Sequence, residues 1–470
     1  MEKNEINKKE WWEKPGFGIM YQIEVRPGWV WNRNYDKFNA SMLDENGNFK
    51  FDGPFCKMKK WVEFSKKVGL DYHIFEAKWH DGICYWDTKY TDWKTPEDYC
   101  KVFAEESKKN KIPFMFYYSS IFDHNPMFDD IQPLRGLTPS FIAMHSEDKE
   151  FVQNYSKKVE EIVFNLFSAS KQRRGKKLPE DYEFFDDLKF HDYEYNPAKY
   201  EDYLKASVKE LIDNYKPDGM WMDWYWTTEE TSTYIVMDLL ENEYPEVVLT
   251  YNQSISYKLG RVIKLRYAHY LCGEAHDVPL AWKIGNKYRT KKVLWELLGP
   301  AAENFDDPTS RSDPNEIIRI AAIIMASGGK YVFGLLSQMD GELFPEPAKN
   351  VEFFGTWYKS RKPLFRDAIP MTYKGKKVPG IDVNEKEFGI IGSIHEGDNL
   401  IHLINFKGKV LDVTLRFSLD KWENVDKIML EPMKAELDFK KDGNEIIVLI
   451  SEKNIDSVDT ILRICSASKI

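Results

Sequence analysis

One carboxylate, Asp223, lies among aromatic residues in the segment MWMDWYW, residues 220–226. The segment is an apolar run after the turn sequence KPDG, so Asp223 is expected where a buried strand gives way to a loop. A carboxylate in such a place can attack the anomeric carbon of a sugar, and neighbouring aromatic rings can stack on the sugar's C–H faces. The alternative is a structural aspartate that caps a helix or forms a salt bridge in the loop.

Cleavage of a glycosidic bond needs a second carboxyl group, which protonates the leaving oxygen. Glu274 in YLCGEAHD is the first choice, because it ends an apolar run about one strand–helix–strand unit plus a loop beyond Asp223. Glu296 in VLWELLGP is the second choice, and the sequence leaves the role open between the two. A surface glutamate is the alternative for each.

Other chemistries lack their sequence signatures. His276 and Asp277 follow Glu274, but no H-E-x-x-H or comparable spacing accompanies them, so neither a metal nor a cofactor is predicted. The G-x-S-x-G of serine hydrolases is absent. No G-x-G-x-x-G or phosphate-binding loop stands near a strand end, which removes the usual support for a nucleotide-binding fold.

The candidate carboxylates need a scaffold that brings several strand ends together. Strand-like runs alternate with helical periodicity over about 350 residues, which predicts a parallel sheet and favours a closed (β/α)8 TIM-like barrel. A barrel carries its active site at the C-terminal strand ends, which also selects KWHDG, residues 78–82. The predicted strands are residues 16–25, 70–79, 113–120, 220–226, 247–252, 266–274 and 330–336, and the predicted helices lie near residues 55–69, 200–215, 233–240 and 313–326. A further helix is expected to open at Thr95-Pro96, with an N-cap and a proline in its first turn.

The hydrophobic pattern changes near Pro370. Short alternating runs without helical spacing follow, and they predict a C-terminal β-sandwich domain of roughly 100 residues. The expected domains are therefore a catalytic barrel over residues 1–368 and a β-sandwich over residues 369–470. The segment near residues 168–198 has charge runs and no clear period, so it is predicted to be a loop insertion, either a solvated excursion or a partner-binding segment.

Amino-acid composition limits the classes of partner that the protein is expected to bind. Lys and Arg number 66 against 76 Asp and Glu, a formal net charge of −10 in 470 residues, which argues against nucleic-acid and anionic-membrane partners. The 15 Trp, 26 Tyr and 29 Phe favour sugar binding, with a large aromatic core as the alternative. Five scattered cysteines without a C-x-x-C pair, and a charged N-terminus without an apolar run, predict a cytoplasmic protein. A homo-oligomer is compatible with these features.

Five segments between residues 15 and 370 occur in the order found in one enzyme family. KWHDGICYWDTKYTDW (78–93) resembles a K-H-H-D-G-F pattern followed by tryptophan and T-D-W/Y. FYYSS (116–120) is similar to a third-strand Y-Y-S, and YKPDGMWMDW (215–224) looks like a segment with a nucleophilic aspartate. ASGGKYVFGLLSQMDGEL (326–343) and EFFGTWYKSRKPLF (352–365) continue the series. Together they resemble the α-L-fucosidases of glycoside hydrolase family 29.

The resemblance implies a retaining exo-glycosidase that removes terminal α-L-fucosyl residues from an oligosaccharide or glycoside. Asp223 would form the covalent glycosyl-aspartate, and Glu274 would be the acid/base because it precedes what looks like the family's W-E. His80, Tyr117 and Trp221 match sugar-contacting strand ends of the family.

Asp223-Trp224 stands where the family has D-G, and two sugar-contacting positions also depart from the family pattern. Gln22 in MYQIE (20–24) stands where the family has the histidine of F-x-H-W-G, and Trp79 replaces the first histidine of K-H-H-D-G. We expect both to line the same pocket as Asp223 and to weaken turnover of plain α-L-fucosides, because an indole lacks the hydrogen-bonding versatility of an imidazole. A same-fold glycosidase for another sugar and a catalytically silent carbohydrate-binding protein are the competing functions.

Overall fold

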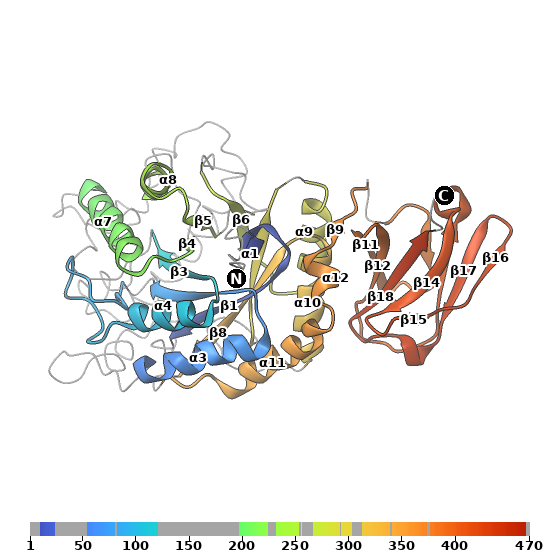
Figure 1. Ribbon diagram of the computed structural model, residues 1–470, viewed down its shortest axis with the longest axis horizontal. Coiled ribbons are helices and arrows are strands. Elements are labelled where there is room, and N and C mark those ends of the chain that lie inside the picture. Colours follow the sequence, from blue (N-terminus) through green and yellow to red (C-terminus); the bar gives the residue numbers. More distant parts are fainter. Residues whose placement is uncertain are drawn as a thin grey trace, which may run out of the picture.

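The computed structural model describes residues 10–23, 54–79, 82–120, 197–223, 232–252, 255, 267–291, 293–302, 313–338, 341–373 and 377–466. They form a closed barrel of eight parallel strands and a C-terminal domain built on two antiparallel sheets (Figure 1). The expected fold class, a (β/α)8 barrel followed by a β domain, is confirmed.

The barrel strands follow one another around the sheet in sequence order, and β8 pairs with β1 to close it. Because all eight are parallel, their C-terminal ends lie on one rim of the barrel. The strands are β1 (Gly16–Ile23), β2 (Tyr72–Lys78), β3 (Phe114–Ser119), β4 (Gly219–Asp223), β5 (Val248–Tyr251), β6 (Tyr270–Glu274), β7 (Trp295–Pro300) and β8 (Lys330–Ser337).

Helices cover the outside of the barrel, where their apolar faces pack with the outward-facing strand residues in one large core, except for α1, whose Trp11 packs against the cluster inside the barrel. The described helices are α1 (Glu10–Glu13), α3 (Pro54–Val68), α4 (Tyr99–Asn110), α7 (Pro197–Tyr215), α8 (Ser232–Glu243), α9 (Val278–Tyr288), α10 (Pro314–Ala326), α11 (Pro345–Lys359) and α12 (Lys362–Arg366). Helix α3 ends before Gly69, whose φ of 78° is the left-handed conformation that glycine readily adopts after a helix.

The start of α4 differs from the expectation. The helix begins at Tyr99 and not at Thr95, and Asp98 is its N-cap, with a side chain that accepts from the Lys101 N–H. Thr95 is held elsewhere, since its backbone N–H donates to the Cys84 carbonyl at 3.0 Å and its hydroxyl to the Glu97 carbonyl at 2.7 Å. A tertiary contact therefore decides between two residues that are both good N-caps.

The C-terminal domain packs its two sheets around a second apolar core. One sheet has four strands in the order β10-β13-β17-β16, and the other has six in the order β15-β14-β18-β12-β11-β9. The elements are β9 (Ile369–Pro370), β10 (Ile381–Val383), β11 (Phe388–His395), β12 (Asp398–Asn405), β13 (Val413–Ser418), α13 (Leu419–Trp422), β14 (Val425–Glu431), β15 (Ala435–Glu436), β16 (Phe439–Asp442), β17 (Glu445–Ile450), η1 (Glu452–Asn454) and β18 (Asp459–Ser466).

The six-stranded sheet of this domain faces the barrel through α9, α10 and α12 (Figure 1). Trp282 of α9 meets Phe406 with ring centroids 5.0 Å apart, and Phe365 of α12 meets His402 at 5.1 Å. Among the described residues, no helix combines the length and apolar character that crossing a bilayer requires.

Candidate active site

Neighbouring strands of the barrel end in polar residues that meet one another. Asp223 is the last residue of β4, Glu274 is the last residue of β6, and Asn252 directly follows β5. The backbone N–H of Asn252 donates to the Met222 carbonyl at 2.8 Å, which keeps the chain beyond β5 alongside the end of β4. The fold thus gathers side chains from separate strand–helix units at the C-terminal rim, where barrel enzymes carry their active sites.

Asp223 is 7% exposed, and its carboxylate accepts a hydrogen bond on each oxygen. The Tyr117 hydroxyl of β3 donates to Oδ2 at 2.6 Å, and the Asn252 amide donates to Oδ1 at 2.9 Å. The Ser120 hydroxyl also donates to the Asp223 backbone carbonyl at 2.7 Å. Two donors on the carboxylate suit the acceptor-only character of its ionised form and hold it in one orientation.

Glu274 shares the Asn252 amide with Asp223. The same nitrogen donates to Oε1 of Glu274 at 2.7 Å, while His276 Nε2 lies 3.2 Å from Oε2. The two carboxylate oxygens can be no farther apart than the sum of the two amide contacts, about 5.6 Å. Carboxyl groups about 5–5.5 Å apart are typical of retaining glycosidases, whereas inverting enzymes need roughly 6.5–9.5 Å.

Aromatic rings lie beneath the carboxylates. Tyr117 and Trp221 are stacked, with ring centroids 5.2 Å apart and planes inclined by 23°. Both are almost fully buried and belong to the apolar cluster inside the barrel, which also contains Trp79. The Trp221 indole N–H donates to Glu296 Oε1 at 2.8 Å, so this ring is fixed from below.

Glu296 does not lie at a strand end. It is the second residue of β7, near the N-terminal end of the barrel, and its side chain is fully buried. The Tyr72 hydroxyl and the Trp221 indole donate to its carboxylate, and burial together with Glu296 raises the pKa of Tyr72 well above its usual value. The prediction that Glu296 could end a strand and serve as the acid is therefore wrong, because β7 begins at Trp295 and points this carboxylate into the interior.

Comparison with known protein families identifies the family of this chain. The sequence profile of the α-L-fucosidase family matches residues 6–362, which is most of the chain. The chain belongs to the α-L-fucosidase family, glycoside hydrolase family 29. No curated protein sequence matches it.

Solved structures of fucosidases share the fold of this family member across nearly the whole chain. The α-L-fucosidase isoenzyme 1 of Paenibacillus thiaminolyticus is 17% identical, with a TM-score of 0.66 over 98% of this chain and 99% of its own. The Thermotoga maritima α-fucosidase in complex with fucose is 16% identical, with a TM-score of 0.62 over 97% and 96%. A Bacteroides thetaiotaomicron α-L-fucosidase, described as a trapped covalent intermediate, is 16% identical with a TM-score of 0.61 over 98% and 95%. At these identities the likeness establishes the fold.

Gln22 lies within β1 and faces β2. Its amide nitrogen donates to Oε2 of the fully buried Glu76 at 3.1 Å. Gln22 is 5% exposed, and its carbonyl oxygen has no hydrogen-bond partner among the residues that the structure describes. Where the fucosidase pattern has a histidine, this chain therefore presents a buried amide whose oxygen is an acceptor and whose nitrogen gives one of its two hydrogens to Glu76.

Trp79 follows the last residue of β2 and is 6% exposed. Its membership of the interior cluster with Tyr117 and Trp221 places its indole on the inner side of the barrel. His80 lies outside the described residues, as do residues 168–196 of the predicted insertion; its last two residues belong to α7. That Gln22 and Trp79 share one sugar pocket with Asp223 stays a prediction.

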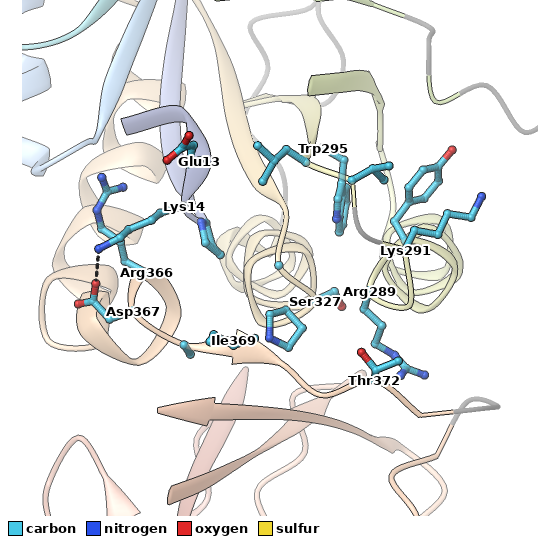
Figure 2. Close-up of a pocket in the computed structure, with 17 residues that line it drawn as sticks. Glu13, Lys14, Arg289, Lys291, Trp295, Ser327, Arg366, Asp367, Ile369 and Thr372 are labelled. Carbon is cyan, nitrogen blue, oxygen red and sulfur yellow. Dashed lines mark hydrogen bonds and ion pairs between the residues drawn. The ribbon is translucent and has the colours of Figure 1, made fainter. Parts of the chain in front are cut away.

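A separate pocket of about 780 Å³ lies at the opposite end of the barrel (Figure 2). Its lining includes Leu294, which directly precedes β7, Gly328, which lies two residues before β8, and residues of the link to the C-terminal domain. The Lys14–Asp367 ion pair, 3.0 Å, spans one edge. The pocket therefore belongs to the N-terminal face of the barrel, and the predicted site residues do not line it.

The C-terminal domain contains a serine, a histidine and an aspartate in hydrogen-bonding order. Ser393 Oγ lies 3.4 Å from His402 Nε2, and His402 Nδ1 lies 2.8 Å from Asp459 Oδ2. All three are at most 1% exposed and pack at the boundary with α12. A substrate could not reach this serine, so the chain of hydrogen bonds is a structural feature of the six-stranded sheet, and only the contact of the His402 ring with Phe365 crosses to the barrel.

Within the described parts of the chain, no group of three or more His, Cys, Asp or Glu side chains is placed to hold a metal ion.

Sequence reasoning missed Asn252 and Glu76. Asn252 closes the apolar run VVLTYN and could have been found by the rule that selected the other strand ends. Glu76 lies inside an apolar run, and a charged residue in a buried strand is itself a signal of function.

Proposed function

We propose that this family member is a retaining exo-glycosidase that hydrolyses terminal α-L-fucosyl or closely related α-L-glycosyl residues. The observation that carries the proposal is the single Asn252 amide between Asp223 and Glu274, which limits the separation of Asp223 Oδ1 and Glu274 Oε1 to about 5.6 Å. Family membership supports the reaction class, and the relative described as a trapped covalent intermediate supports the retaining route.

The reaction would proceed in two displacements. In the first, a carboxylate oxygen of Asp223 bonds to the anomeric carbon while the glycosidic bond breaks, and Glu274 gives its proton to the leaving oxygen. In the second, water attacks the same carbon, its proton passes to Glu274, and the bond to Asp223 breaks. Each step restores the protonation state that the other requires, so the proposal needs no cofactor.

The neighbouring groups fit these roles. The Tyr117 hydroxyl orients the attacking carboxylate of Asp223, and the fully buried Trp221, stacked on Tyr117, supports that ring from the interior of the barrel. A solved relative is described as a complex with fucose, which supports a fucoside or related glycoside as the substrate. Carbohydrate rings present C–H faces to aromatic surfaces and hydroxyls to the polar rim.

A second candidate is a glycosidase of the same family that prefers another sugar. The observation that favours it is the Gln22–Glu76 contact, which engages the amide nitrogen and leaves the buried carbonyl oxygen to accept from a ligand. A histidine ring at that place can donate or accept through a ring nitrogen, whereas the Gln22 carbonyl oxygen only accepts, and the second amide hydrogen stays on a nitrogen that already donates to Glu76. A sugar hydroxyl that donates to this oxygen is therefore favoured.

The experiment is hydrolysis of a panel of aryl glycosides that includes the α-L-fucoside, with native protein and the variant Asp223→Gly. We expect activity on at least one α-L-glycoside, loss of turnover by several orders of magnitude in the variant, and partial recovery with azide. Near-normal turnover by Asp223→Gly would show that Asp223 is not the nucleophile. Binding of sugars without hydrolysis by the native protein would establish the silent carbohydrate-binding function instead.

We also propose that the protein acts in the cytoplasm. Cys100 and Cys465 are free thiols in the described structure, as expected in a reducing compartment. Fractionation of the native source tests this proposal. Recovery of the protein from the medium or an exported fraction would overturn it.

A further inference from the structure

We infer that Asn252 is a positioning residue that sets the geometry of the Asp223 and Glu274 carboxylates and the place of the acid's proton. The inference rests on the proposed function, since it assumes that these carboxylates are the reacting pair. It adds a residue for which neither the sequence motifs nor the family resemblance provides a role.

The first support is the geometry of the amide. One nitrogen donates to Oδ1 of Asp223 at 2.9 Å and to Oε1 of Glu274 at 2.7 Å, so each amide hydrogen serves one carboxylate. If the Asn252 amide were turned by 180°, its oxygen would face an oxygen of each carboxylate. No hydrogen would then lie between these acceptors when both carboxylates are ionised. The partners of Asn252 therefore decide which of its atoms faces the site.

The second support is the way Asn252 itself is held. The side chain is 3% exposed, and its backbone N–H is bonded to the Met222 carbonyl, the residue before Asp223. A change in the position of the β4 end would move the amide with it. Because the same amide contacts Glu274, the position of the β4 end also affects the position of the Glu274 carboxylate.

The bridge has a consequence for the proton of the general acid. A neutral Glu274 carries one hydrogen, and Oε1 already receives the Asn252 N–H, so the hydrogen belongs on Oε2. His276 Nε2 lies 3.2 Å from that oxygen and is half-exposed. The structure therefore assigns Oε2 as the atom that delivers the proton and later receives one from water.

The bridge also acts against repulsion between the carboxylates. When both are ionised, two like charges lie within about 5.6 Å in a mostly buried site. A donor between them favours each charge and removes the need for a shared proton. After the glycosyl-enzyme forms, Asp223 has lost its charge, and the same amide stabilises the Glu274 carboxylate that acts as base.

Denaturant unfolding tests the bridge without any need for activity. The variants are Asn252→Ala, Asp223→Ala, Glu274→Ala and the two doubles that include Asn252→Ala. We expect the midpoint shifts of both doubles to differ from the sums of their single shifts, because each pair is in contact. Additive shifts in either pair would overturn the bridge. Thr250→Val is the matched control, since Thr250 lies on β5 two residues before Asn252, is fully buried and donates to the Tyr270 carbonyl at 2.9 Å. Its shift should add to both carboxylate variants.

Kinetics tests the positioning role. We expect Asn252→Ala to lower kcat by about 10²-fold and to change KM by less than about threefold, because misplacement of the reacting groups costs rate and not ground-state affinity. Asn252→Asp, which has the same shape, should be more impaired because it replaces the donor with a third carboxylate. Thr250→Val should keep its kcat.

The outcomes separate the two proposals. A raised KM with unchanged kcat in Asn252→Ala would make Asn252 a sugar contact and overturn the positioning role. A native protein active on glycosides with additive midpoint shifts would keep the proposed function and overturn the bridge. A native protein inactive on the whole panel would overturn the proposed function, and the catalytic role of Asn252 with it, even where the midpoint shifts are non-additive.

Discussion

Replacement of Tyr117 by phenylalanine removes one hydroxyl from the candidate site and little else. The hydroxyl donates to Asp223 Oδ2 at 2.6 Å, whereas the ring stacks on Trp221 with centroids 5.2 Å apart. Phenylalanine keeps the stacked ring and its burial inside the barrel. The variant therefore isolates the effect of the hydrogen bond on the Asp223 carboxylate.

The expected magnitude follows from the type of bond. A buried hydrogen bond to a charged group is worth about 1.5–3 kcal/mol, and it favours the ionised carboxylate over the neutral one. At 1.36 kcal/mol per pKa unit, loss of the bond should raise the pKa of Asp223 by about one to two units. Since the nucleophile must be ionised, activity should be lost at a higher pH than in the native protein as the solution becomes more acidic.

The assay is the pH dependence of kcat/KM on the best aryl glycoside of the panel. The acidic limb of the Tyr117→Phe profile should move upward by about one to two pH units, with the basic limb less affected. Tyr118→Phe is the matched control, because Tyr118 is the next residue of β3 and its ring packs in the outer core. An unmoved acidic limb in Tyr117→Phe, or an equal shift in Tyr118→Phe, would refute the assignment of Asp223 as the group that must ionise.

Three other outcomes are expected. Glu274→Ala should slow substrates with poor leaving groups more than activated aryl glycosides, and equal loss on both would move the acid/base role elsewhere. Trp79→His combined with Gln22→His should raise kcat/KM on an α-L-fucoside by roughly one to two decades, and a native protein that is already fast and is slowed by the change would contradict altered specificity. Burial lowers the pKa of Lys330 from 10.5 to about 8, so the unfolded chain binds this proton more tightly between those values. The free energy of unfolding of the native protein minus that of Lys330→Met should therefore rise by up to about 3 kcal/mol between pH 8 and pH 10.5. Denaturant unfolding of both proteins at these two pH values measures the difference. A difference that stays flat or falls would contradict the prediction.

Much of the fold could be predicted from the sequence, because strands and helices carry periodic patterns that are local. The expected runs at residues 16–25 and 330–336 correspond to β1 and β8, the pair that closes the barrel. Local patterns do not determine at which residue each helix begins. Thr95 and Asp98 are both good caps, and only the bond from Thr95 to the distant Cys84 carbonyl decided between them.

Residue types and their place at the ends of apolar runs were enough to select Asp223 and Glu274 as candidates. The sequence alone could not decide which carboxylate accompanies Asp223, because that depends on where a strand begins. Glu296 enters β7 at its second residue and becomes a buried anchor for Trp221, although its apolar neighbours resemble those of a strand end.

The contacts within the site were decided by tertiary structure. Asn252, Gln22 and Glu76 acquire their significance from partners on other strands, at distances of 2.7–3.1 Å. Those partners are set by the register in which the parallel strands close into a barrel. Register is a property of the whole sheet, since it depends on the packing of all eight strands and their helices at once, whereas hydrophobic periodicity reports only which face of one segment is buried.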